Sequence, residues 1–102
     1  MRYLISVKQL FEVPVEMAPA MLQGMIDWAN RYKASGQLQD IWVYTGKPEG
    51  GGIANVNSHE ELDNIMREMP LFIFSNIEVT PINDFIGGLS KSLEVMKMMM
   101  NH

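Results

Sequence analysis

The chain has 102 residues, 47% of them apolar and 20% charged, which is typical of one globular domain with a modest core. Its formal net charge is −4 and its eight Lys and Arg residues are scattered along the chain, so we expect no nucleic-acid partner. It contains no cysteine, which excludes disulfides and thiolate chemistry and suits a reducing compartment.

The first half of the chain predicts a strand, a helix and a second strand. Arg2–Gln9 alternates apolar and polar side chains, as a strand does, and this pattern is typical of neither a signal peptide nor a membrane span. We therefore expect a cytoplasmic protein with no membrane partner. Apolar residues recur at helical spacing across residues 21–32, and Gly36 is suited to end that helix. Leu38–Thr45 predicts the second strand.

The second half predicts a turn, two further strands and a helix between them. Gly46–Gly52 is expected to be a flexible turn because of its Gly and Pro content, and Ile53–Asn57 a short third strand. Ser58 and Glu61 match a capping box, which predicts that a second helix begins there. Leu71–Thr80 alternates again and predicts the fourth strand.

The order β-α-β-β-α-β is the α+β arrangement of ferredoxin-like folds. Right-handed crossovers would place both helices on one face of a four-stranded antiparallel sheet. We expect residues 1–82 to form this domain. Residues 83–102 are expected to form a C-terminal helical tail with an apolar stripe, which must be buried either on its own domain or on a partner subunit.

The other face of the sheet carries no helix in this arrangement. By period-two alternation, Trp42 and Tyr44 share that face with Phe72 and Phe74. An exposed aromatic surface of this kind usually marks an interface or a ligand site. We therefore expect a second subunit to cover it, so that two sheets pack face to face in a homo-oligomer.

Few residues are suited to catalysis. The histidines are His59 and His102, no metal-ligand spacing appears, and the glycine run lacks the ending of a phosphate-binding loop. We therefore expect no metal and no cofactor, which leaves carboxylates on the strands. Asp40 or Glu78 would act as a general base if it pointed into an apolar pocket.

Polar and aromatic groups on the strands are the candidates for binding a small-molecule substrate. Trp42 would stack on a planar unsaturated ring. The residues that would hydrogen-bond a developing enolate are Tyr44, Asn55 and Asn76. Structural roles are also open: Glu78 would pair with Lys8 or Arg2 across the sheet, Asp40 would belong to a turn, and Trp42 would pack in the core or an interface.

Several short stretches together carry a family resemblance. They are residues 41–42 (IW), 58–62 (SHEEL), 69–72 (MPLF) and 76–81 (NIEVTP), and they resemble the muconolactone isomerase family. The resemblance implies a ferredoxin-like fold, dimeric α+β barrels in which two sheets face each other, and often a ring of such dimers. It also implies a cofactor-free isomerase that moves a proton within an unsaturated lactone from aromatic catabolism.

Three functions stay open at this point. The first is an isomerase acting on a small unsaturated lactone or cyclic acid, with Asp40 or Glu78 as the base. The second is a cofactor-free oxygenase or cyclase acting on polyketide-like aromatics held by Trp42 and Tyr44. The third is an oligomeric small-molecule-binding protein without catalysis. The resemblance implies an Arg directly after the Trp, where this chain has Val43; we place the isomerase first because the motifs match it.

Overall fold

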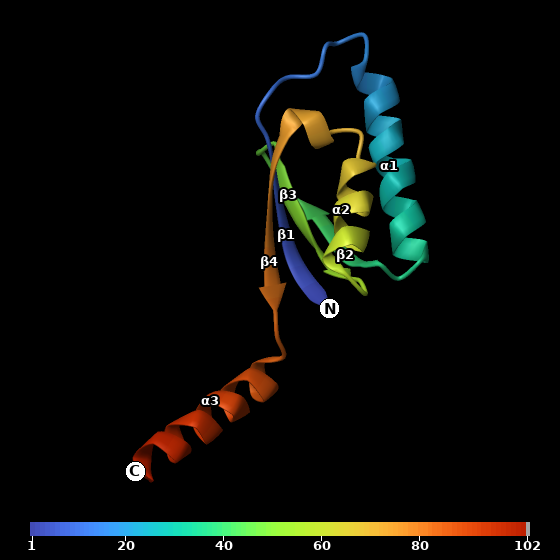
Figure 1. Ribbon diagram of the computed structural model, residues 1–102. Helices are drawn as coiled ribbons and strands as arrows, with labels where there is room; N and C mark the ends of the chain where they lie inside the picture. Colours follow the sequence, from blue (N-terminus) through green and yellow to red (C-terminus); the bar gives the residue numbers. More distant parts are fainter. Residues whose placement is uncertain (102) are drawn as a thin grey trace.

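The computed structural model describes residues 1–101, which form one antiparallel sheet, three α-helices and a short 3-10 turn. The strands are β1 (Arg2–Gln9), β2 (Leu38–Val43), β3 (Glu49–Asn55) and β4 (Ser75–Ile82). The helices are α1 (Ala18–Ala34), α2 (His59–Arg67) and α3 (Phe85–Met100), and η1 (Phe72–Phe74) is the 3-10 turn. The strand order is β2-β3-β1-β4, and α1 and α2 lie on the same face of the sheet (Figure 1). This confirms the predicted α+β arrangement.

The register divides the strand residues between two faces. Tyr3 is buried beneath the helices, whereas its alternating neighbours on β1 lie on the helix-free side, which we call the open face. Ser6, on the open face, pairs with Gly51 of β3 and with Glu78 of β4, and Gly51 pairs with Trp42 of β2. Trp42 and Glu78 therefore lie on the predicted face.

The glycine run belongs to the sheet, which corrects the expected flexible turn. Gly50–Gly52 lies within β3 and pairs with both β1 and β2, so the third strand begins at Glu49 and ends at Asn55. A Cβ atom added to Gly51 would lie 2.6 Å from the backbone oxygen of Ile5. The prediction was wrong because glycine serves close strand packing as well as turns.

The start of β4 also differs from the prediction. Phe72 and Phe74 were expected on the open face, but the Phe74 amide donates to the Leu71 carbonyl at 3.0 Å and closes η1. The Phe72 ring packs against the core, with the Arg67 guanidinium 5.5 Å from its centroid. The open face is therefore less aromatic than expected.

The core lies between the sheet and the two covering helices. Its buried side chains come from β1, the end of α1, β2, β3 and α2, and they include Tyr3, Ile5, Tyr32, Leu38, Ala54, Leu62, Ile65, Met66 and Met69. The buried residues of α2 are Leu62, Ile65 and Met66, which recur at helical spacing. Gly36 follows α1 with a φ of 81°, as its predicted role at a helix end requires.

The predicted capping box is present at the start of α2. The Ser58 hydroxyl accepts a hydrogen bond from the Glu61 amide at 3.1 Å. The Glu61 carboxylate accepts from the Asn57 amide at 2.7 Å, one residue before the cap, and also from the Gln37 side chain. These two hydrogen bonds to the ionised form, the backbone one first, hold the pKa of Glu61 below its ordinary value of 4.5.

The tail forms a helix that stands clear of the domain. Asp84 caps α3 by accepting from the Gly87 amide at 2.9 Å, and the helix then projects from the end of β4 (Figure 1). The described chain is 67 Å long and only 27 by 23 Å across, and no residue of α3 is buried. None of the helices in residues 1–101 combines the length and apolar character that crossing a membrane requires.

The close approach at β3 predicts the effect of adding one methyl group. Gly51→Ala forces β1 to shift, because the new Cβ meets backbone rather than a flexible side chain. We expect the free energy of unfolding to fall by about 1–3 kcal/mol in urea titrations. Gly88→Ala is the control, since a Cβ there meets nothing within 4 Å. Equal stability of the two variants would contradict this packing.

The capping box predicts a pH dependence of stability. A carboxyl group with a lowered folded-state pKa contributes stability that is present above its unfolded pKa and is lost as pH falls through its folded pKa. Glu61→Gln removes the titration but keeps an acceptor for the Asn57 amide. The thermal midpoint of the variant should therefore fall less between pH 7 and pH 3 than that of the parent protein. Identical falls would contradict the assignment.

Candidate active site

A cavity of about 280 Å³ lies between the sheet and the two helices that cover it. We call it the helix-side cavity. Its apolar walls are formed by Leu22, Met25 and Trp28 from α1, by Met66 and Met69 from α2 and the segment after it, and by Ile5, Val7 and Ile41 from the sheet. Largely apolar hollows of this kind are the usual sites for small-molecule ligands.

The glycines of β3 form the floor of the helix-side cavity. Gly50 and Gly52 pair with Val7 and Ile5 of β1, whose side chains face the helices, and both glycines line the cavity. Strand alternation would place a side chain from either position on the cavity side. A Cβ on Gly52 would also lie 2.8 Å from the Asp40 carbonyl oxygen. The same absence of side chains therefore permits both the strand packing and the cavity.

Few polar groups line the helix-side cavity. Ser75 stands at the start of β4, where its Oγ is buried without a hydrogen-bond partner among residues 1–101. Gln9 is also in the lining, but its Nε2 already donates to the Phe11 carbonyl at 2.9 Å. Buried polar atoms without a partner are rare in native proteins, so Ser75 is a candidate donor or acceptor for a ligand.

The charged residues of the lining lie in and just after the turn between β2 and β3. They are Lys47 and Glu49, the residue at which β3 begins. Glu49 pairs with Lys8 of β1, whose side chain is on the open face, so the Glu49 carboxylate lies on that face although the residue also borders the cavity. The Glu49 carboxylate lies 3.9 Å from the Lys8 ammonium group and is 30% exposed. A carboxylate beside an apolar cavity is the group that a proton transfer needs.

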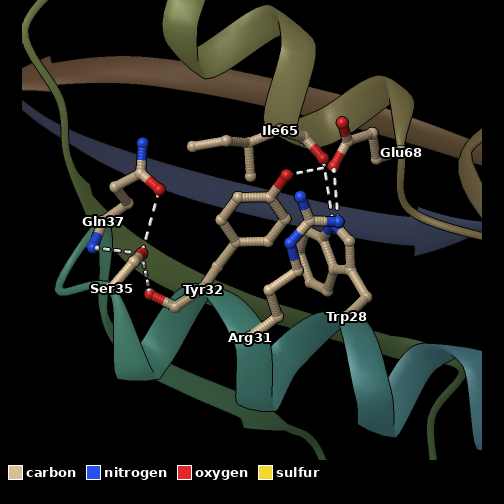
Figure 2. A network of polar contacts seen from close by, with 7 residues as sticks. All are labelled: Trp28, Arg31, Tyr32, Ser35, Gln37, Ile65 and Glu68. Carbon is tan, nitrogen blue, oxygen red and sulfur yellow. Dashed lines mark hydrogen bonds and ion pairs between the residues drawn. The ribbon is translucent and has the colours of Figure 1, made fainter.

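A polar network holds the cavity wall formed by Trp28. The Trp28 indole donates from Nε1 to the Ile65 carbonyl at 2.9 Å, which ties α1 to α2 (Figure 2). One turn further along, the Tyr32 hydroxyl donates to Glu68, and the Arg31 guanidinium lies 3.7 Å from the same carboxylate. The hydrogen bond to Glu68, together with burial, raises the pKa of Tyr32 above its ordinary value of 10.0.

A second, more polar hollow of about 270 Å³ lies on the open face. We call it the open-face hollow, and it is lined by Ser6, Val7, Lys8, Tyr44, Glu49, Gly50, Asn76 and Glu78. It brings together three residues singled out from the sequence, namely Tyr44, Asn76 and Glu78. The ion-pair partner of Lys8 is Glu49 and not Glu78.

The other three candidates lie elsewhere. Asp40 is exposed on β2, and its Oδ1 accepts from the Ile41 amide at 3.0 Å. Asn55 is exposed at the end of β3. Trp42 is on the open face of β2, where its ring lies close to Gly51, although the residue also borders the helix-side cavity. Because β2 and β4 are opposite edges of the sheet, Asp40 and Glu78 are separated by three strand spacings, about 14 Å. One small substrate cannot contact both within one chain.

Sequence reasoning missed the polar residues of the helix-side cavity. Glu49 was overlooked because it stands in a segment interpreted as a flexible turn, and Ser75 because it was placed in the middle of a strand. One signal for Glu49 was available in the sequence: a carboxylate that directly precedes a glycine run, shortly after a predicted strand. No sequence signal marked Ser75. Across residues 1–101, no group of three or more His, Cys, Asp or Glu side chains is placed to hold a metal ion.

Comparisons with known proteins point to one family. The family model described as muconolactone delta-isomerase matches residues 1–86. The chain is 32% identical over 71 residues to Muconolactone Delta-isomerase 1 of Acinetobacter lwoffii, across 70% of this chain and 74% of that protein. It is 29% identical over 83 residues to Muconolactone Delta-isomerase of Rhodococcus opacus, across 78% of this chain and 89% of that protein. A crystal structure of muconolactone isomerase has the same fold, with a TM-score of 0.75 at 21% identity over 82% of this chain and 90% of that one.

The orphaned hydroxyl of Ser75 predicts an unusual effect on stability. Ser75→Ala removes a buried polar group that has no partner, so the free energy of unfolding of the ligand-free protein should rise by about 1 kcal/mol. Ser58→Ala is the matched control, because it removes a helix cap and should lower the same quantity by about 1 kcal/mol. Urea titrations measure both. Equal losses in the two variants would mean that Ser75 is already hydrogen-bonded.

Proposed function

Because this chain belongs to the muconolactone delta-isomerase family, we propose that it is an isomerase that moves a proton within a small unsaturated lactone or cyclic acid. In such a reaction a base removes a proton from the carbon beside the carbonyl group, and the electron pair spreads into a conjugated enolate. The proton then returns to a carbon further along the system, so the double bond moves. No oxidant or reductant is consumed.

The helix-side cavity is the observation that carries this proposal. Its volume of about 280 Å³ suits a compact ring rather than a large aromatic system, since drug-sized ligands occupy pockets of roughly 300–1,000 Å³. Its apolar walls exclude water around the reacting carbon. A proton held by a nearby group is then returned to the substrate instead of being lost to solvent.

We assign the base to Glu49 because it borders both hollows; to reach a ring in the helix-side cavity, its side chain would turn away from Lys8. Ser75 is assigned to the carbonyl oxygen of the ring, where its unpaired hydroxyl would donate a hydrogen bond to the developing enolate oxygen. Lys47 lines the same cavity and would attract a carboxylate carried by the substrate. These three roles require no cofactor.

The open-face hollow supports a second location for the base. Glu78 lies there with Tyr44 and Asn76, which would hydrogen-bond an enolate as the sequence suggested. Glu49 lines both hollows, so it belongs to either site. We place the reaction in the helix-side cavity because the open-face hollow is lined mainly by polar residues, which gives less protection from water.

We further propose that two copies cover each other's open faces in a homo-oligomer, a dimer or a ring of dimers. Leu4 is 37% exposed on this face and Tyr44 is 51% exposed, beside the partly buried Trp42 and Ile53. Apolar surface on the helix-free side of a sheet is usually covered by another layer. A cytoplasmic role in aromatic catabolism is consistent with the acidic, cysteine-free composition and forms part of the proposal.

The base assignment is tested by proton exchange in a candidate lactone. Glu49→Gln should slow the uptake of deuterium from D₂O into the ring by at least about 100-fold, because the general base is lost. Proton NMR of the lactone follows the exchange. Glu78→Gln and Asp40→Asn are the controls and should retain the parent rate within a few-fold.

The same experiment decides between the competing readings. Loss of exchange in Glu78→Gln with full activity in Glu49→Gln would move the reaction to the open-face hollow. Metal-independent uptake of oxygen with an aromatic substrate would instead indicate a cofactor-free oxygenase, and ring closure would indicate a cyclase. Binding of lactones without any turnover above background would identify a binding protein and would contradict the isomerase.

A further inference from the structure

Helix α3 presents an apolar surface that no other described part of the chain covers. Leu93 is 53% exposed, Met96 60% and Met100 82%, although all three are large apolar side chains. The helix follows β4 after two residues, and its direction carries it away from the sheet (Figure 1). Family similarity ends at residue 86, so most of α3 lies outside the matched region.

The apolar residues of α3 follow the spacing of a coiled-coil seam. Successive positions are separated by three, four, three and four residues, which is the alternation of a and d sites in a heptad repeat. The seam consists of Ile86, Leu89, Leu93, Met96 and Met100. The opposite side of the helix carries Lys91 and Glu94 together with the exposed apolar residues Val95 and Met98. The regular a/d spacing of the seam is what fits it to a neighbouring helix.

We propose that α3 is a dimerisation helix whose seam packs against the same seam of a second copy of this chain. Leu93 is the middle residue of the seam. When two α3 helices overlap along their full length, Leu93 therefore contacts Leu93 of the second copy in either the parallel or the antiparallel arrangement. Of the positions that flank the seam between Leu89 and Met100, Lys97 carries a charge, whereas Ser90, Ser92 and Met99 are neutral. Two copies can therefore approach with little like-charge repulsion.

The charges of α3 argue against a membrane surface as its occupant. Helices that lie in the membrane interface carry a polar face rich in Lys and Arg. The polar side of α3 has Lys91 and Lys97 but also Glu94, and the whole chain has a net charge of −4. The domain that precedes α3 is also not its occupant, since no residue of the helix is buried.

The length of α3 indicates that this pairing depends on the rest of the chain. Its 16 residues span about 24 Å, or little more than two heptads. A free-standing coiled coil usually needs about three to four heptads. Contact between the domains of two chains would supply the missing stability, because it raises the effective concentration of one helix near the other. Since β4 leads directly into α3, the paired helices would also fix the two β4 edges relative to each other.

The absence of cysteine from the sequence allows a direct test by disulfide cross-linking of the full chain. Leu93→Cys places a thiol at the centre of the seam, and Glu94→Cys places one on the opposite side of the same helix. Under mild oxidation we expect Leu93→Cys to form covalent dimers at least about tenfold faster than Glu94→Cys, because pairing raises the local thiol concentration. Non-reducing electrophoresis measures both rates. Equal rates would overturn the proposal.

A second variant tests the same seam without cysteine. Leu89→Glu combined with Leu93→Glu should raise the protein concentration at which half of the oligomer dissociates by at least about tenfold, since charge is buried in the seam. Lys91→Glu is the matched control and should leave this concentration unchanged. Sedimentation equilibrium measures it, and circular dichroism checks that the domain stays folded. An unchanged oligomer in the double variant would overturn the proposal. Co-sedimentation of the protein with anionic vesicles through α3, in place of self-association, would also overturn it.

Discussion

The close packing of three strands around Gly50–Gly52 is the constraint on which the rest of this structure depends. Because Gly51 and Gly52 have no side chains, the backbones of β1 and β2 approach to distances at which a Cβ atom would collide with Ile5 or Asp40. The same positions leave empty space beneath the helices. The glycines that allow close strand pairing therefore also leave the space of the helix-side cavity, because both need the same missing side chains.

The helices keep this cavity open by being fastened to each other. Trp28 forms a cavity wall, and its indole N–H also donates a hydrogen bond to the backbone of α2. One turn further along, the Tyr32 hydroxyl donates a hydrogen bond to Glu68. These side-chain bonds fix the spacing between α1 and α2, so the cavity walls do not collapse onto the glycine floor. A charged residue, Glu49, borders the cavity at the point where the β2–β3 turn ends and β3 begins.

The sequence predicted those features whose signal is local. Alternation along β1 and the cap at Ser58 gave the element order and most boundaries, because each depends on neighbouring residues. The glycine run was misinterpreted, since a turn and a closely packed strand require the same residue. Phe72 was placed on the wrong side because a 3-10 turn before β4 interrupts the period-two pattern. Glu49 and Ser75 are brought to one cavity from distant segments, which no local pattern encodes.

We propose that the helix-side cavity is the small-molecule site of this isomerase-family chain. Methionine methyl groups report on it directly, since Met25, Met66 and Met69 line the cavity while Met96 and Met98–Met100 lie far away on α3. In carbon–proton NMR spectra of protein labelled at these methyl groups, addition of an unsaturated lactone should shift the signals of the three cavity methionines and leave those of α3 in place. Unmoved cavity signals would contradict the account, as would shifts confined to the Asn76 side-chain amide of the open-face hollow in nitrogen–proton spectra of uniformly labelled protein.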